Sequence, residues 1–175
     1  MPVRFAVFIA ESLDGYIARP DGSLDWLKPF EGEEHGYAAF FAGVDALVIG
    51  RGTYDTVLAF PEWPYGDKPV IVCTRRPASP VHGEEIWSGT PRVLADRLDR
   101  EGVRRVYLDG GALIRGFLAD GVPLDELTIN VIPIILGAGL PLFTSGLPEL
   151  PLSLIEAKTF PSGLVQLRYT PKGTR

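Results

Sequence analysis

Cysteine and histidine are scarce in this chain of 175 residues, which has one cysteine and two histidines. A single cysteine excludes a disulfide framework within one chain. Cys73 ends an apolar run typical of a buried strand, where burial raises the pKa of a thiol and disfavours a nucleophilic role. Neither His35 nor His82 has partners at metal-ligand spacing, so we expect no metal site. The chain also lacks a Gly-x-Ser-x-Gly elbow, which argues against serine hydrolase chemistry.

Blocks of basic residues and long apolar runs are missing as well. The net charge of -5 and the absence of a Lys/Arg cluster argue against nucleic acid or an anionic membrane surface as a partner. The longest apolar runs, such as residues 131–139, are about half of the ~20 residues that a membrane span needs, and no signal-type segment precedes the first charges. We therefore expect a cytoplasmic protein with a small-molecule substrate.

The composition, with 46% hydrophobic residues, favours a single domain over residues 1–175. We find no internal repeat. Strand-like runs occur at residues 3–10, 45–49, 69–74, 105–108, 124–136 (interrupted near Pro133), 153–160 and 164–169. Helix-like segments occur at 33–44, from about 53 to 60, 91–102 and 112–120, and the segments 11–26 and 77–90 are predicted to be a long loop and an irregular stretch.

This alternation predicts an α/β fold with three layers. The central sheet is expected to be mostly parallel, with helices on both faces and an antiparallel C-terminal hairpin at its edge. The turn of the hairpin is expected at residues 161–163, Pro-Ser-Gly. Thr90 followed by Pro91 is typical of an N-cap and a first helical position.

Two glycine-rich junctions each follow a predicted strand and open a predicted helix, namely residues 50–53 (Gly-Arg-Gly-Thr) and 109–112 (Asp-Gly-Gly-Ala). At the carboxyl ends of parallel strands, such junctions can bind phosphate through free helical N–H groups, and glycine permits close approach. Arg75 and Arg76 could hold a further, terminal phosphate. Alternatively, the glycines only satisfy backbone geometry and the arginines are solvated. Together they favour a phosphorylated dinucleotide, although the Rossmann fingerprint is absent.

Several segments, in this order, resemble those of a known superfamily: residues 12–18 (Ser-Leu-Asp-Gly-Tyr-Ile-Ala), 20–26 (Pro-Asp-Gly-Ser-Leu-Asp-Trp), 49–54 (Ile-Gly-Arg-Gly-Thr-Tyr), 108–111 (Leu-Asp-Gly-Gly), 125–127 (Asp-Glu-Leu) and 133–137 (Pro-Ile-Ile-Leu-Gly). They resemble the dihydrofolate reductase-like superfamily. The resemblance is closest to the C-terminal reductase domain of the bifunctional riboflavin-pathway deaminase-reductase and its stand-alone relatives. It covers residues 3–169 and implies a dihydrofolate reductase-like fold, NADPH as cofactor and a homodimer.

The resemblance also implies roles for particular residues. The nicotinamide side would be formed by Ala10, Ile17 and Ala18. The pyrophosphate would be held by Gly50, Arg51, Gly52 and Thr53, and the 2'-phosphate by Thr74, Arg75 and Arg76. The rest of the phosphate and nicotinamide wall would consist of Asp109, Gly110, Gly111, Ala112, Leu113 and Ile114.

Candidates for catalysis are two acids. Glu31 lies near the position of the substrate-binding acid of dihydrofolate reductase, where an apolar pocket could raise the pKa of a carboxyl group. Its alternative role, shared with Glu33 and Glu34, is to start a helix. Asp14 is the second candidate, and its alternative role is that of a turn residue that binds its own backbone. Asn130 is a candidate for reading the edge of a pyrimidine or pterin.

The implied activity is NADPH-dependent reduction of a small heterocyclic substrate, with 5-amino-6-(5-phosphoribosylamino)uracil as the named candidate. The loop after Asp14 lacks the basic character expected for a ribosyl phosphate grip. A dihydrofolate or pterin reductase, and a non-catalytic dimeric nucleotide-binding protein, therefore remain alternatives. The dimer interface is expected at the strand over residues 124–136 and the C-terminal hairpin.

Overall fold

The computed structural model describes residues 1–173, which form one large sheet, one small sheet and five helices. The strands are β1 (Arg4–Ser12), β2 (Tyr16–Ala18), β3 (Ala46–Gly50), β4 (Val70–Cys73), β5 (Glu85–Trp87), β6 (Arg105–Asp109), β7 (Glu126–Ile132), β8 (Leu140–Pro141), β9 (Leu152–Thr159) and β10 (Val165–Pro171). The helices are the 3-10 helix η1 (Asp25–Phe30) and α1 (Tyr37–Ala42), α2 (Arg51–Leu58), α3 (Pro91–Arg100) and α4 (Gly111–Ala119).

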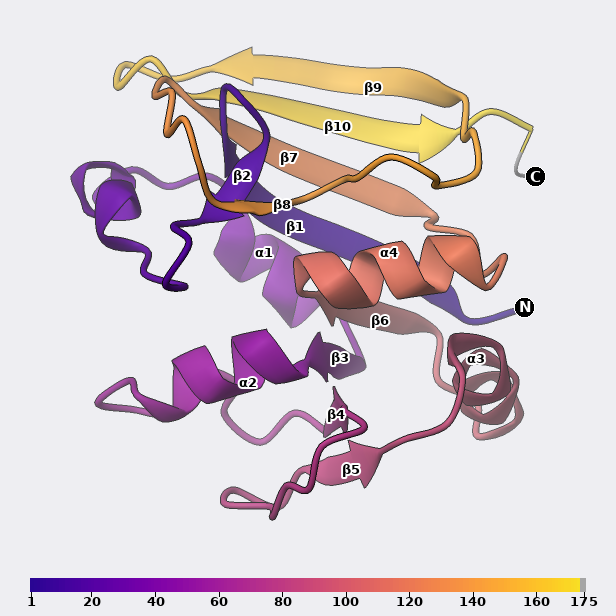
Figure 1. Ribbon diagram of the computed structural model, residues 1–175. Helices are drawn as coiled ribbons and strands as arrows, with labels where there is room; N and C mark the ends of the chain where they lie inside the picture. Colours follow the sequence, from indigo (N-terminus) through magenta and orange to yellow (C-terminus); the bar gives the residue numbers. More distant parts are fainter. Residues whose placement is uncertain (174–175) are drawn as a thin grey trace.

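The large sheet has eight strands in the order β5-β4-β3-β6-β1-β7-β10-β9. From β5 to β7 all neighbours are parallel, whereas β10 runs antiparallel to both β7 and β9. Figure 1 shows the β9–β10 hairpin at one edge and β5 at the other. The predicted fold class is confirmed, and the carboxyl ends of the parallel strands share one edge of the sheet.

Helices cover both faces of the sheet because its central strands are apolar on both sides. In β3, Val48 packs in one layer with Phe5 of β1 and Phe117 of α4. Its neighbour Leu47 points to the other layer, which contains Tyr54 of α2 and part of α1. Within residues 1–173, no helix is both long enough and apolar enough to cross a membrane.

Local sequence signals located several boundaries correctly. Thr90 is the N-cap of α3, where its side chain accepts a hydrogen bond from the Val93 N–H at 3.4 Å, and Pro91 is the first helical residue. The hairpin turn lies at residues 161–163, where the Gly163 N–H donates to the Phe160 carbonyl at 2.9 Å. Both signals act within a few residues, so they are visible in the sequence.

The prediction of one long loop over residues 11–26 is wrong. The strand β1 continues to Ser12, β2 pairs antiparallel with β8, and η1 begins at Asp25. The three residues of β2 have no partner nearby in the chain, since β8 follows β7. Their pairing depends on the tertiary fold and leaves no local signal.

The predicted amphipathic helix starts later than expected, at Tyr37. Gly36 precedes it with a φ of 83°, a left-handed conformation outside the helix. Glu33 does not begin the helix, because its carboxylate accepts hydrogen bonds from the Ser162 N–H and hydroxyl in the β9–β10 turn. An acid that suggests a helix start therefore connects two distant segments instead.

Two further boundaries differ from prediction. The stretch over residues 77–90 contains β5, a three-residue strand whose single neighbour is β4. The strand predicted over residues 124–136 ends at Ile132, because Pro133 has no N–H to continue a ladder. In addition, α2 begins at Arg51, slightly before its expected start.

Replacement of Phe117 by alanine tests the contribution of the core. Phe117 is fully buried and packs edge-to-face on Phe5 with 5.0 Å between ring centroids. We expect Phe117→Ala to lower the free energy of unfolding by about 3–5 kcal/mol in urea denaturation. The control Val81→Ala changes a side chain that is 62% exposed and should change the free energy of unfolding by less than about 0.5 kcal/mol. Equal effects of the two substitutions would contradict this core assignment.

Candidate active site

The two glycine junctions meet at the carboxyl ends of the neighbouring strands β3 and β6. Gly110 has a φ of +115°, and a Cβ on it would lie 3.0 Å from Thr53 Oγ1 and 3.5 Å from the Gly50 nitrogen. A Cβ on Gly50 would in turn lie 3.4 Å from the Leu113 Cβ. Any larger residue at position 110 would be strained and would push the junctions apart. The first turns of α2 and α4 are therefore adjacent.

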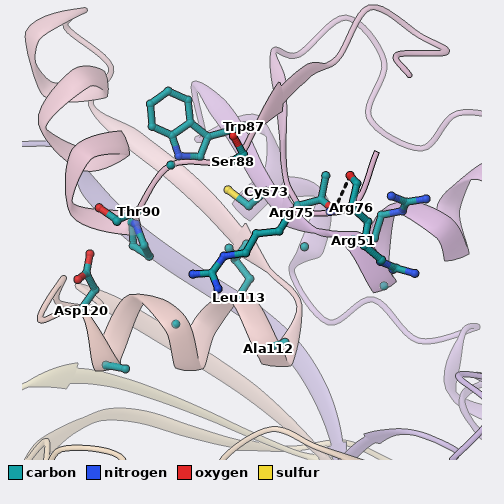
Figure 2. A pocket seen from close by; sticks show the side chains of 17 residues that line it. Arg51, Cys73, Arg75, Arg76, Trp87, Ser88, Thr90, Ala112, Leu113 and Asp120 are labelled. Atoms are coloured by element: carbon teal, nitrogen blue, oxygen red, sulfur yellow. Dashed lines mark hydrogen bonds between the residues drawn. The ribbon is translucent and has the colours of Figure 1, made fainter. Parts of the chain in front are cut away.

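A cleft of about 700 Å³ opens beside these junctions (Figure 2). It is formed by α4 and by the chain segments that leave β3, β4 and β5. Its lining residues are Gly50, Arg51, Gly52, Cys73, Thr74, Arg75, Arg76, Trp87, Ser88, Gly89, Thr90, Pro91, Ala112, Leu113, Gly116, Ala119 and Asp120. The starts of α2, α3 and α4 all contribute to it, and helix N-termini attract anions. At α3, however, the Arg92 N–H donates to the Asp120 carboxylate at 2.8 Å and the Val93 N–H donates to the Thr90 hydroxyl, so α2 and α4 are the helices with N–H groups left for a ligand.

The arginines of the cleft have different surroundings. Arg51 donates from Nε to the Asp55 carboxylate at 2.7 Å and from Nη1 to the Pro77 carbonyl at 2.9 Å. Arg76 also reaches Asp55, at 3.4 Å, and its side chain is 67% exposed. Arg75 has no ion pair or side-chain hydrogen bond to any residue in the range 1–173. In Figure 2 it extends into the cleft, away from Arg51 and Arg76.

Thr74 and Cys73 form the floor beside these arginines. Thr74 is buried, and its hydroxyl accepts a hydrogen bond from the Arg76 N–H at 3.1 Å, which fixes the turn after β4. Cys73 lines the cleft and is not fully buried. Burial nevertheless raises the pKa of its thiol to about 12, so the thiolate is disfavoured, as expected from the sequence.

Residues 87–91 are part of the cleft that the sequence reasoning missed. Trp87 ends β5, and the guanidinium of Arg97 lies 4.8 Å from its ring centroid. The segment continues through Ser88 and Gly89 to the N-cap of α3. A strand, a glycine and a helix start occur here in the same order as at the other two junctions. That repeated order was the signal for a third junction.

A second, smaller cavity of about 240 Å³ lies near the carboxyl ends of β1 and β7. Ala10 and Asn130 are direct neighbours across these strands. Both line the cavity, and Asn130 is only 5% exposed. The other lining residues are Phe8, Ile9, Leu27, Phe30, Glu31, His35, Tyr37, Ile132 and Leu164. The end of β6 lies between β3, beside the cleft, and β1, beside this cavity.

The residues predicted for the nicotinamide side do not all lie at one cavity. Ile17 lies in β2, and a Cβ on Gly111 would be 2.9 Å from its Cδ1. Ala18 is buried in the same strand. Ile114 is fully buried in the core between α4 and the sheet, outside the lining of the cleft and of the second cavity.

The two predicted acids lie in different surroundings. Glu31 is exposed and lines the rim of the second cavity, directly after η1. Asp14 lines neither cavity. Its carboxylate accepts hydrogen bonds from the Ser12 hydroxyl at 2.6 Å and from the N–H groups of Leu136 and Gly137 at 3.0 and 2.8 Å. The bond from Ser12 is the main cause that lowers the pKa of Asp14.

A third acid, Asp109, lies at the end of β6 near a group of tyrosines. Burial raises the pKa of Asp109 to about 6, although hydrogen bonds to the Gly110 N–H and the Tyr107 side chain lower it. Burial, followed by the nearby charge of Asp109, raises the pKa of Tyr37 to about 12. Tyr37 lines the second cavity, and Tyr107 donates to the Phe8 carbonyl at 3.1 Å. Asp109 thus lies behind the cavity wall.

No three Cys, His, Asp or Glu side chains within residues 1–173 form a group that could hold a metal ion. The site consists of a large cleft lined by three arginines and by helix starts, a small cavity with mainly apolar walls, and Asp109 at the end of the strand between them.

Comparisons with known proteins give a family and the same fold. The family model described as the RibD C-terminal domain matches residues 5–166. The uncharacterized protein YwjB of Bacillus subtilis (strain 168) is 41% identical over 174 residues, which cover 97% of this chain and 98% of YwjB. A crystal structure from Shewanella sp. PV-4, named "Putative riboflavin biosynthesis protein", has 36% identity and a TM-score of 0.89 and covers 97% of this chain and 99% of that one.

Dihydrofolate reductase from Enterococcus faecalis, in complex with NADP(H), has the same fold at 16% identity. Its TM-score is 0.68, with 98% of this chain and 99% of that chain covered. The fold class inferred from the sequence is therefore confirmed by an independent likeness.

The raised pKa of Asp109 predicts how stability depends on pH. The unfolded carboxyl group titrates near 3.8 and the folded one near 6, so the folded state binds more protons between these values and loses stability as pH rises. We expect Asp109→Asn to be more stable than wild type at pH 8 by about 1–3 kcal/mol. The difference in the free energy of unfolding between Asp109→Asn and wild type should shrink as pH falls from 6 to 4.

Urea denaturation across pH 4–8 measures this effect. Asp96→Asn, a change of an exposed residue in α3, is the matched control and should not share the pattern. An Asp109→Asn variant that is less stable than wild type at pH 8 would show that the ionised carboxylate is stabilised in the fold.

Proposed function

The chain belongs to the family of RibD C-terminal domains, and on this premise we propose that it is an NADPH-dependent reductase of a small heterocyclic substrate. The family is related to reductases. The observation that carries the cofactor assignment is Arg75, a guanidinium without a side-chain partner among residues 1–173, in a cleft that three helix starts line. An unpaired cation beside free N–H groups favours a ligand with several phosphates.

The residues of the cleft fit this cofactor. We assign the pyrophosphate to the start of α2, from Gly50 to Thr53, because its first N–H groups have no partner within the helix and because a Cβ on Gly52 would meet nothing within 4 Å, which leaves room for close approach. The 2'-phosphate is assigned to the segment after β4, where Arg75 extends into the cleft (Figure 2) and Arg76 can contribute by turning away from Asp55, with which it pairs at 3.4 Å. When bound, NADPH supplies the hydride for the reduction.

The nicotinamide end is assigned to the region between the cleft and the second cavity. Gly111, two residues after β6, lies against Ile17 of β2, since a Cβ on it would be 2.9 Å from Ile17 Cδ1. Ala10 then presents only a methyl group toward the cavity that we assign to the substrate. Residues this small allow two flat rings to approach each other, which hydride transfer requires.

Reduction also requires a proton, and we assign its source to Asp109. A carboxyl group with a pKa near 6 is partly protonated at neutral pH, as a general acid must be. Its contact with Tyr107 and its proximity to Tyr37 connect it to the wall of the substrate cavity. Glu31, at the rim of the same cavity, is the competing acid. The three hydrogen bonds to Asp14 favour a structural role for that residue.

We further propose a cytoplasmic homodimer. β7 lies between β1 and β10, so both of its edges are already paired. The segment that follows β7, residues 133–143, is the part of the predicted strand region that can contact a second copy. Ile135, Leu140 and Phe143 in that segment are 70%, 46% and 42% exposed. Leu154 and Ile155 on the edge strand β9 are 55% and 53% exposed. These two apolar groups are the surfaces that a second copy would cover.

Substitution of the two arginines tests the cofactor assignment. We expect Arg75→Ala and Arg76→Ala each to weaken NADPH binding by roughly 10- to 100-fold in calorimetric titration, because each removes a charged contact to phosphate. Binding of NADH, which has no 2'-phosphate, should change by less than about 3-fold. Arg100→Ala, outside the cleft, is the control. Equal losses for the two cofactors would reject the 2'-phosphate assignment, and wild type that binds neither would reject the proposed function.

Conservative replacement of the acids tests the proton source. We expect Asp109→Asn to lower kcat by about 10²- to 10⁴-fold, with the Kd for NADPH unchanged. Glu31→Gln is the matched comparison and should retain most of kcat. NADPH oxidation followed by absorbance, with 5-amino-6-(5-phosphoribosylamino)uracil and 7,8-dihydrobiopterin as the compounds tried, provides the measurement. A normal kcat for Asp109→Asn with a lost kcat for Glu31→Gln would transfer the role to Glu31.

A further inference from the structure

A pair of buried amides controls the polarity of the small cavity. Gln166 of β10 and Asn130 of β7 are direct neighbours across the two strands and are 9% and 5% exposed. The Gln166 Nε2 donates to the His35 backbone carbonyl at 2.7 Å and to Asn130 Oδ1 at 2.9 Å. Since a backbone carbonyl can only accept, the amide nitrogen of Gln166 must face it. Both of its protons are then used.

The orientation of Asn130 follows from that of Gln166. Its Oδ1 accepts from Gln166, so its amide nitrogen faces the other way, and Asn130 lines the cavity. No hydrogen bond from this nitrogen to the protein is formed among residues 1–173, and it is not one of the fully covered side-chain atoms that lack a partner, so it reaches the space of the cavity. Water in the cavity can accept a hydrogen bond from it, and a ligand with a well-placed acceptor can take the place of that water.

The wall that fixes this pair is itself held in place. Glu33, two residues before His35, binds both the N–H and the hydroxyl of Ser162 in the hairpin turn. The ring of His35 packs edge-to-face on Phe160 with 4.8 Å between centroids. The His35 carbonyl therefore has a fixed position, and the donor of Asn130 is preorganised.

The cavity has no guanidinium or ammonium group to bind a phosphate. Of the described residues that line it, none is lysine or arginine, and the imidazole of His35 is already paired, because its Nε2 lies 3.4 Å from the Glu33 carboxylate. Glu31 lies at the rim. Its walls are mainly aromatic and aliphatic, with Phe8, Phe30 and Tyr37 among them. An anion here would lose its hydration without gaining a cation. The volume of about 240 Å³ suits one or two fused rings.

We propose that the substrate is a flat heterocycle without a phosphate group, and that Asn130 binds a carbonyl oxygen or ring nitrogen of it through its amide N–H. This inference rests on the proposed reductase function, since it assigns the small cavity to the substrate. It separates this chain from an enzyme whose substrate carries a ribosyl phosphate. Asn130 is the residue that determines which edge of the ring enters.

A matched pair of ligands tests the missing phosphate. We would titrate wild-type protein, with and without NADP⁺, with 5-amino-6-ribosylaminouracil, with its 5'-phosphate, and with 7,8-dihydrobiopterin. We expect at least one phosphate-free compound to bind, and the 5'-phosphate to bind no tighter than its dephosphorylated partner. A phosphate that improves affinity by 10-fold or more would overturn the proposal, as would no binding of any of the three compounds.

Asn130→Asp tests the donor. The carboxylate keeps an oxygen for Gln166 but can no longer donate to the ligand, so we expect affinity for the ring compound to fall roughly 10- to 100-fold. The Kd for NADPH and the midpoint of thermal unfolding report an intact fold. Asn130→Ser, which restores a short donor, should recover part of the affinity. Unchanged ring affinity in Asn130→Asp would overturn the role of Asn130.

These readouts are separate from those of the proposed function. Binding of the ring compounds with the expected Asn130→Asp effect, but without NADPH binding or oxidation, would reject the reductase and leave the cavity assignment intact. NADPH binding together with a strong preference for the phosphorylated compound would reject the present inference alone.

Discussion

The close approach of Gly110 to Gly50 and Thr53 is the constraint on which the site depends. A Cβ at position 110 would lie 3.0 Å from Thr53 Oγ1, and the φ of +115° at Gly110 disfavours any side chain. This contact places the first turns of α2 and α4 side by side at the ends of adjacent parallel strands. Free N–H groups from two helices then face one cleft, with the start of α3 at its far side. These N–H groups favour the binding of an anion in the cleft even without a contribution from its arginines.

Charge is divided unequally between the two cavities, and the division matches two different ligands. The large cleft has Arg51, Arg75 and Arg76 at its lining, whereas the small cavity has no basic residue among its described lining residues. The protein as a whole has a net charge of -5, so its positive potential is confined to the large cleft, where we propose that the phosphorylated cofactor binds. The end of β6 separates the two regions. Asp109 lies there, near Tyr107 of β6 and Tyr37 of α1. Phosphate affinity, ring packing and proton supply are in this way assigned to separate parts of the sheet edge.

The sequence predicted the structural features that depend on neighbouring residues. It did not predict those that depend on contacts between distant segments. The glycine junctions and the Thr90–Pro91 helix start were found because a strand, a glycine and a cap lie within a few positions. The pairing of β2 with β8 and the bond between Glu33 and Ser162 join residues more than a hundred positions apart, and no local pattern reports them. Arg75 and Arg76 were expected to act as one pair. The chain turns after β4, where the Arg76 N–H donates to the Thr74 hydroxyl, and the two guanidinium groups diverge (Figure 2).

The segment that begins at Ser12 contributed strongly to the family resemblance. In the structure, its hydrogen bonds position the backbone around the site. Ser12 is fully buried, donates to Asp14 and accepts from the Tyr16 N–H at 3.0 Å. Asp14 in turn accepts from two N–H groups beyond the end of β7. These bonds join the loop after β1 to the loop after β7, and those two strands carry Ala10 and Asn130. A motif with this role holds the two walls of a cavity at a set separation and leaves the side chains between them free to vary. A resemblance that depends on this motif therefore indicates the fold and the proposed cofactor. The substrate has to be inferred from the residues that line the cavity.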